Sequence, residues 1–99
     1  STEESLYRLG THLVHHNHLI LGRRVLGYCR DLSYDKADID AHLAYISWNT
    51  GNEEQTMQFV EGALDGRSNV LFELFGIPYN ANISSKAFIN SIKERTGSA

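Results

Sequence analysis

The chain has 99 residues, the usual size of one domain, and its 41% hydrophobic and 21% charged residues exclude an intrinsically disordered protein. Its net charge of −3, from 9 basic and 12 acidic residues, disfavours a general nucleic-acid binder, which needs a basic excess. The single cysteine, Cys29, excludes a fold held by intrachain disulfides, and no apolar run reaches the ~20 residues of a membrane span. The first residues are polar and acidic, unlike a secretory leader, so we expect one cytoplasmic domain over residues 1–99.

The N-terminal third predicts one long amphipathic helix. Ser1 and Glu4 have the spacing of a capping box, and no proline interrupts the pattern as far as Arg30. Gly10 and Gly27 on the apolar side are expected to mark helix crossings. The apolar face of this helix comprises Leu6, Tyr7, Leu9, Leu13, Val14, Ile20, Leu21, Val25 and Tyr28.

Two shorter helices are predicted next. The first is capped by Ser33 or Asp35 and runs to about Asn49, and Gly51 suits the left-handed position that follows a helix. Another is capped by Asn52 and closed by Gly66. Because the connection between the two is short, they are expected to pack as antiparallel neighbours.

The last third predicts one short helix and one longer helix. The apolar run 69–75 lies between Ser68 and Gly76, and a lone strand there would lack a partner, which favours a helix. A loop around Pro78 precedes a final helix capped by Ser84 or Ser85 and ending near Arg95. The fold class predicted is all-α, a small four- or five-helix bundle with a long N-terminal helix.

The leading functional hypothesis is a non-enzymatic protein-interaction or regulatory module. The sequence has no Cys-x-x-Cys, Gly-x-Ser-x-Gly or His-Glu-x-x-His motif, and a long first helix exceeds what its shorter neighbours can cover. An apolar face left uncovered would bind a protein partner or a second copy of the chain. The residues predicted to bind it are Tyr7, Val14, Leu21, Tyr28, Val70, Phe72 and Phe75.

A metal- or cofactor-binding helical bundle, such as an oxidoreductase component, is the alternative. His12 and His16 lie one helical turn apart and can share a metal ion, with His42 as the candidate third ligand. The simpler interpretation is that these histidines are solvated residues at the polar border of the helix. Apart from this metal-site alternative, no cofactor is predicted. Cys29 is expected to be a buried small hydrophobe.

The basic residues support two further interpretations. Arg8, Arg23 and Arg30 follow nearly one line of the predicted long helix, which would suit an anion or an acidic partner. The blander expectation is that they pair with carboxylates on the next helix. A third functional alternative is a helix-turn-helix-like DNA-binding regulator. Its second helix would present Lys86, Asn90, Lys93 and Arg95 to a groove, although the intervening loop is long for that motif and the net charge is negative.

Overall fold

A computed structural model describes residues 1–32 and 34–97, and every regular element in that part of the chain is a helix. The all-α prediction is confirmed, and the helix count is higher than the four or five expected. The described helices are α1 (Thr2–His15), α2 (Leu19–Asp31), α3 (Lys36–Asn49), α4 (Glu53–Asp65), α5 (Asn69–Phe75) and α6 (Ser85–Thr96). None of them is long and apolar enough to cross a membrane.

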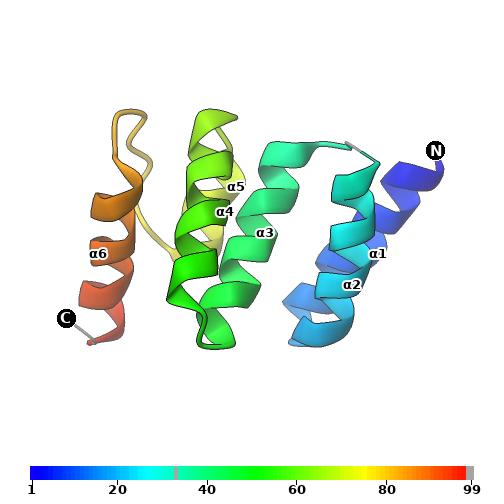
Figure 1. Cartoon of the computed structure of the whole chain (residues 1–99), viewed down its shortest axis with the longest axis horizontal. Helices are drawn as coiled ribbons and strands as arrows, with labels where there is room; N and C mark the ends of the chain where they lie inside the picture. Colours follow the sequence, from blue (N-terminus) through cyan, green and yellow to red (C-terminus); the bar gives the residue numbers. More distant parts are fainter. Residues whose placement is uncertain (33, 98–99) are drawn as a thin grey trace.

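The helices form two layers around α3. In Figure 1, α2, α3 and α4 stand side by side with α6 at the far left, while α1 and α5 lie behind them. The molecule measures 39 × 25 × 20 Å, and α1 and α6 lie toward opposite ends of the long axis. The α1–α2 hairpin therefore forms one end of the molecule, and α6 forms the other.

The predicted long N-terminal helix is wrong, because the chain turns back at Asn17. Asn17 adopts a left-handed conformation with φ of 64°, and its N–H donates to the Val14 carbonyl at 2.9 Å. The next N–H, of His18, donates to the Leu13 carbonyl at 2.8 Å. Asparagine is second only to glycine at this cap position, so the turn costs little there. The apolar face of one expected rod thus becomes the facing sides of two antiparallel helices.

The same cap ends α3 and α4, so three connections of three residues share one geometry. Gly51 (φ 83°) and Arg67 (φ 56°) take the left-handed position of Asn17. The following N–H groups, of Asn52 and Ser68, each donate at 2.9 Å to the carbonyl five residues earlier. The left-handed Gly51 was predicted, whereas after α4 Arg67 takes that position and Gly66 does not. Repeated tight turns fold neighbouring helices antiparallel.

Glycines let the paired helices approach closely. A Cβ on Gly10 would collide with the Leu26 side chain, and one on Gly22 would lie 3.0 Å from Cγ2 of Val14. The space beside Gly62 in α4 is likewise filled by the Asp40 carboxylate of α3. The prediction that Gly10 marks a crossing is confirmed. A Cβ on Gly27 would meet nothing within 4 Å, so no crossing among the described residues uses that glycine.

Helix α3 lies between two apolar clusters and contributes to both. Ile39, Leu43 and Ile46 pack with Val14, Leu26 and the fully buried Cys29. The opposite side of α3 packs against α4 and α5, and α6 packs on α4. The apolar cluster on that side comprises Ala41, Ala44, Val60, Ala63, Leu71, Phe72, Ile77, Phe88, Ile89 and Ile92. The expected burial of Cys29 is confirmed, and α3 is the element that holds both halves of the domain together.

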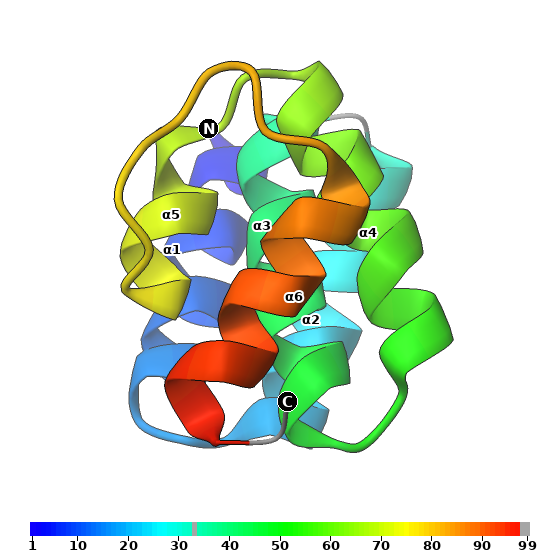
Figure 2. The same ribbon diagram turned by 90° about the vertical axis from the view of Figure 1, so that its left-hand side faces the viewer.

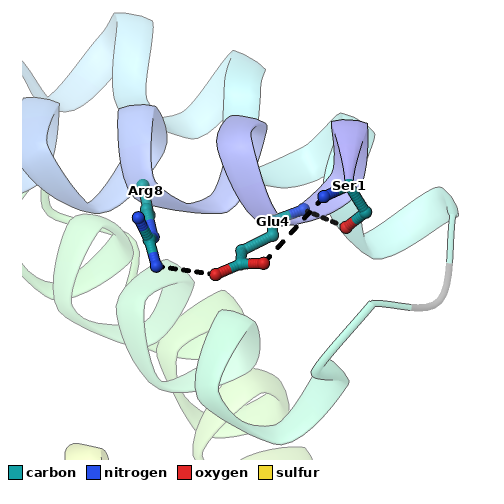
Figure 3. A network of polar contacts seen from close by, with 3 residues as sticks. All are labelled: Ser1, Glu4 and Arg8. Carbon is teal, nitrogen blue, oxygen red and sulfur yellow. Dashed lines mark hydrogen bonds and ion pairs between the residues drawn. The ribbon is translucent and has the colours of Figure 1, made fainter.

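Local caps follow the sequence closely. The side chains of Ser1, Asn52, Ser68 and Ser84 each accept a hydrogen bond from a backbone N–H three residues later. Figure 3 shows the first of these, in which Glu4 also reaches the Ser1 amino group at 4.0 Å and Arg8 at 2.7 Å. Asp35 directly precedes α3, but its side chain makes no capping hydrogen bond, and Ser33, the other predicted cap, lies outside the described residues.

Candidate functional site

Helices α1 and α5 lie on the same side of α3 (Figure 2), and a groove lined by residues of all three helices opens between them. It consists of two adjoining clefts of about 290 and 430 Å³ that share His15, Glu73 and Leu74. Helix α3 contributes His42 to the first cleft and Tyr45 to the second. We call the whole feature the α1–α5 groove; its lining residues are Tyr7, Thr11, Val14, His15, Asn17, His42, Tyr45, Val70, Glu73 and Leu74.

His42 from α3 supplies the most buried polar group of the groove, with 2% of the residue exposed. Its Nδ1 lies 2.8 Å from the Asp38 carbonyl oxygen, which can only accept, so Nδ1 carries the hydrogen. Burial lowers the pKa of His42, and the nearby His15 lowers it further against the opposing Asp38 hydrogen bond. The ring is therefore neutral at pH 7, and Nε2 is a hydrogen-bond acceptor.

Aromatic rings surround His42. Tyr7 and His15, both from α1, meet it edge to face with ring centroids 6.0 and 5.9 Å away. Burial raises the pKa of Tyr7 to about 12, and the charges of Asp38 and Asp35 add to the effect. The Tyr7 hydroxyl thus stays protonated and neutral throughout the physiological range.

Glu73 from α5 gives the groove its negative charge. The side chain of this exposed residue makes no hydrogen bond or ion pair within the described part of the chain. Val70 and Leu74, close by on α5, supply apolar surface beside it. The groove therefore combines an unpaired carboxylate, a neutral imidazole acceptor and apolar walls, a combination that favours a cation carried on an apolar stem.

The seven residues predicted to bind a partner do not form one surface. Tyr7, Val14 and Val70 line the groove, although Val14 is 4% exposed and is mainly a core residue. Leu21 and Tyr28, each more than half exposed, lie on α2. Phe72, with 5% exposure, belongs to the core, and Phe75 is half-buried against Tyr45 and Phe88. The expected uncovered face of the 70–75 segment is therefore largely covered by α3 and α6.

The structure does not assemble the predicted metal site. The rings of His12 and His16 are in contact, with centroids 4.2 Å apart and their planes tilted by 45°, but His42 contacts His15 instead. Among residues 1–32 and 34–97 no group of three or more His, Cys, Asp or Glu could hold a metal ion. His12 of α1 and His16, the cap residue that follows α1, gain no third ligand from α3, because the His42 ring contacts His15.

The three arginines that suggested an anion site have separate intramolecular partners. Arg8 donates to Glu4 within α1 at 2.7 Å. Arg23 donates to the Thr50 hydroxyl at 2.8 Å, and Arg30 donates to Asp40 on α3 at 2.6 Å. The turn at Asn17 places Arg8 on a different helix from the other two, so the expected single line is wrong. For Arg30 the blander expectation, a carboxylate on the next helix, is confirmed.

The DNA-binding alternative relied on the exposed side of α6. Lys93, one of the four residues proposed to contact DNA, forms an ion pair with Glu53 of α4 at 3.1 Å.

The groove residues that were not predicted as site residues are Thr11, His15, Asn17, Tyr45, Glu73 and Leu74. His15 is one of four histidines between positions 12 and 18 of the sequence, but neither it nor Glu73 was expected beside His42, because both become its neighbours only when α1 and α5 pack on α3. Comparison with protein-family models, curated proteins and solved structures finds no match to this chain.

Proposed function

We propose that the chain is a non-enzymatic protein-interaction module that receives a lysine or arginine side chain of a partner polypeptide in the α1–α5 groove. The observation that carries this proposal is the position of an unpaired Glu73 carboxylate beside the neutral acceptor His42 in one cleft. The module was predicted to use its first helix and the 70–75 segment, and Tyr7 and Val70 from those segments line this cleft.

The cleft that contains His42 is the smaller of the two that form the groove, and its size suits a single side chain. Its volume of about 290 Å³ falls at the lower limit of ordinary ligand pockets, which begin near ~300 Å³. The methylene stem of a lysine or arginine would lie on Val70 and Leu74 while its charged head meets Glu73. A partner segment with a basic residue between apolar ones has the matching chemistry.

The test is an NMR titration of the full chain with pentylguanidinium chloride, which reproduces an arginine side chain. We expect amide shifts to concentrate at Tyr7, Thr11, His42, Glu73 and their neighbours. Sodium pentanoate, of similar length and opposite charge, should leave these amides unchanged. Equal shifts with both compounds, or shifts spread over the whole surface, would refute the proposal.

Two variants separate the charge of Glu73 from a general surface effect. Glu73→Gln should weaken pentylguanidinium binding by up to about fivefold, because one exposed charge pair contributes at most about 1 kcal/mol. Glu61→Gln, an exposed carboxylate of α4 outside the groove, is the matched control and should have no effect. Lowering the pH through the depressed pKa of His42 should also weaken binding, because protonation of His42 replaces its acceptor with a positive charge.

A further inference from the structure

A second surface lies on the α1–α2 hairpin, where the exposed large hydrophobic residues gather. Of the six that the described part of the chain contains, only Tyr79 lies elsewhere. The other five are Leu9, Ile20, Leu21, Tyr28 and Leu32, each between 42% and 59% exposed. Helix α2 buries Gly22, Leu26 and Cys29, so the side that contains Ile20, Arg24, Gly27 and Asp31 points away from the core. The outer face of α2, which carries Ile20 and two charged residues and has the exposed Tyr28 at its edge, is thus without a neighbour among the described residues.

Gly27, at the middle of this face, has no packing reason among the described residues to be glycine. A glycine in a helix interior is destabilising relative to alanine unless something must approach closely. Gly10, Gly22 and Gly62 all have such a neighbour, whereas a side chain at Gly27 would meet nothing within 4 Å. This open space points to a surface that approaches α2 from outside.

The charges on the outer face are complementary to a second copy of the same face. Arg24 and Asp31 are exposed, and neither side chain makes a hydrogen bond or ion pair within the described residues. They lie at equal distances on either side of the Gly27–Tyr28 peptide, and seven residues separate them by about 10 Å along the helix. Two antiparallel α2 helices related by a two-fold axis at that point would bring Arg24 of each copy opposite Asp31 of the other. A parallel pair would instead place like charges together.

We propose that two copies of this chain pair through the outer face of α2, antiparallel, with the two-fold axis between Gly27 and Tyr28. In this register the Tyr28 ring of each copy covers Gly27 of the other, where no side chain is in the way. Leu21 and Leu32 lie along the same edge of the face as Tyr28, before and after it in the chain. The surface is separate from the α1–α5 groove, so this inference does not depend on the proposed function.

The pairing is expected to be weak and sensitive to salt. Helix α2 has 13 residues and spans about 20 Å, so the contact falls in the class below about 1,200 Å² that is typical of transient complexes. The ion pairs at its edge are exposed and therefore screened by salt. We expect a dissociation constant in the micromolar range at low salt.

Sedimentation equilibrium between about 1 μM and 1 mM tests the proposal with charge exchange. Arg24→Asp and Asp31→Arg should each weaken dimerisation at least tenfold, because each places like charges opposite one another twice. An equimolar mixture of the two variants should pair with an affinity within threefold of that of the unaltered chain. The double variant Arg24→Asp/Asp31→Arg should pair with itself equally well. Circular dichroism at low concentration checks that every variant is folded.

A matched substitution controls for general loss of apolar surface. Tyr28→Asp should abolish pairing, whereas Tyr79→Asp, at an equally exposed tyrosine far from α2, should leave it unchanged. The proposal is overturned if the unaltered chain stays monomeric at 1 mM, if mixing the two charge variants restores nothing, or if Tyr79→Asp has the effect of Tyr28→Asp.

Discussion

The ion pair between Arg30 and Asp40 offers a sharp test of the packing, because its two members differ in burial. The Asp40 side chain is 3% exposed and lies against Gly62 of α4, while the Arg30 side chain is 37% exposed. Replacing Arg30 with methionine keeps an apolar stem beside Phe59 but leaves the buried carboxylate without its charged partner.

The expected loss follows from that burial. Removing one member of a fully buried pair costs about 3–5 kcal/mol, and because water reaches Arg30 we expect Arg30→Met to lose about 2–3 kcal/mol. Urea denaturation at pH 7, followed by circular dichroism, would then show a midpoint lower by roughly 1.5–2 M for a domain of this size. The protein concentration should stay near 1 μM to exclude self-association.

Arg8→Met is the matched control. Arg8 forms an ion pair of nearly the same length with Glu4, at 2.7 Å, but its side chain is 77% exposed. Exposed pairs one turn apart contribute about 0.3–0.5 kcal/mol, so this variant should be nearly as stable as the unaltered chain. If the two methionine variants differed by less than about 0.5 kcal/mol, the reasoning that burial of Asp40 sets the value of the pair would be wrong.

Substitutions at other positions test the packing, the shifted pKa values and the turn at Asn17. At low protein concentration, Gly10→Ala should lower the free energy of unfolding in urea by about 1–3 kcal/mol, because the added methyl group meets Leu26. Gly27→Ala should raise it by up to about 1 kcal/mol through helix propensity, and equal effects of the two substitutions would contradict the packing described. Ultraviolet titration should show one tyrosine ionising near pH 12, and Tyr7→Phe should remove that step and no other. The pKa of His42 is lower in the folded chain than its ordinary value near 6.5, so neutral His42 contributes fully to stability above pH 6.5 and this contribution is lost as the pH falls through the lowered pKa. Urea midpoints at pH 7.5 and 5 should therefore differ more for the unaltered chain than for His42→Asn. Asn17→Ala should lose about 1–2 kcal/mol at its left-handed position, whereas Asn17→Gly should retain full stability by the same measurement.

Features that depend on a few neighbouring residues could be predicted well. The caps at Ser1, Asn52 and Ser84 and the left-handed Gly51 are confirmed, as is the helical conformation of the 69–75 segment. Each involves hydrogen bonds between residues no more than five positions apart, so local spacing is enough to specify it. The distribution of apolar residues likewise specified an all-α fold.

The candidate site could be predicted only in part. Tyr7 and Val70 were among the expected partner-binding residues, and both line the α1–α5 groove. The proximity of His15 to Glu73 was not anticipated, since the two residues are 58 positions apart in the sequence and no local pattern relates them. A groove formed by three helices depends on how the helices pack, which single-helix periodicity does not contain.

Asn17 separates most clearly what the sequence determines from what the tertiary structure decides. By itself the sequence determined that residues on both sides of Asn17 are helical and which of their faces are apolar. Only the tertiary structure decided that the helix breaks there, because the gain comes from packing Gly10 against Leu26 and Gly22 against Val14. That choice also separated Arg8 from Arg23 and Arg30 and left the outer face of α2 uncovered. Its physical reason is that burial between two antiparallel helices is a non-local free energy, whereas helix propensity and capping are local.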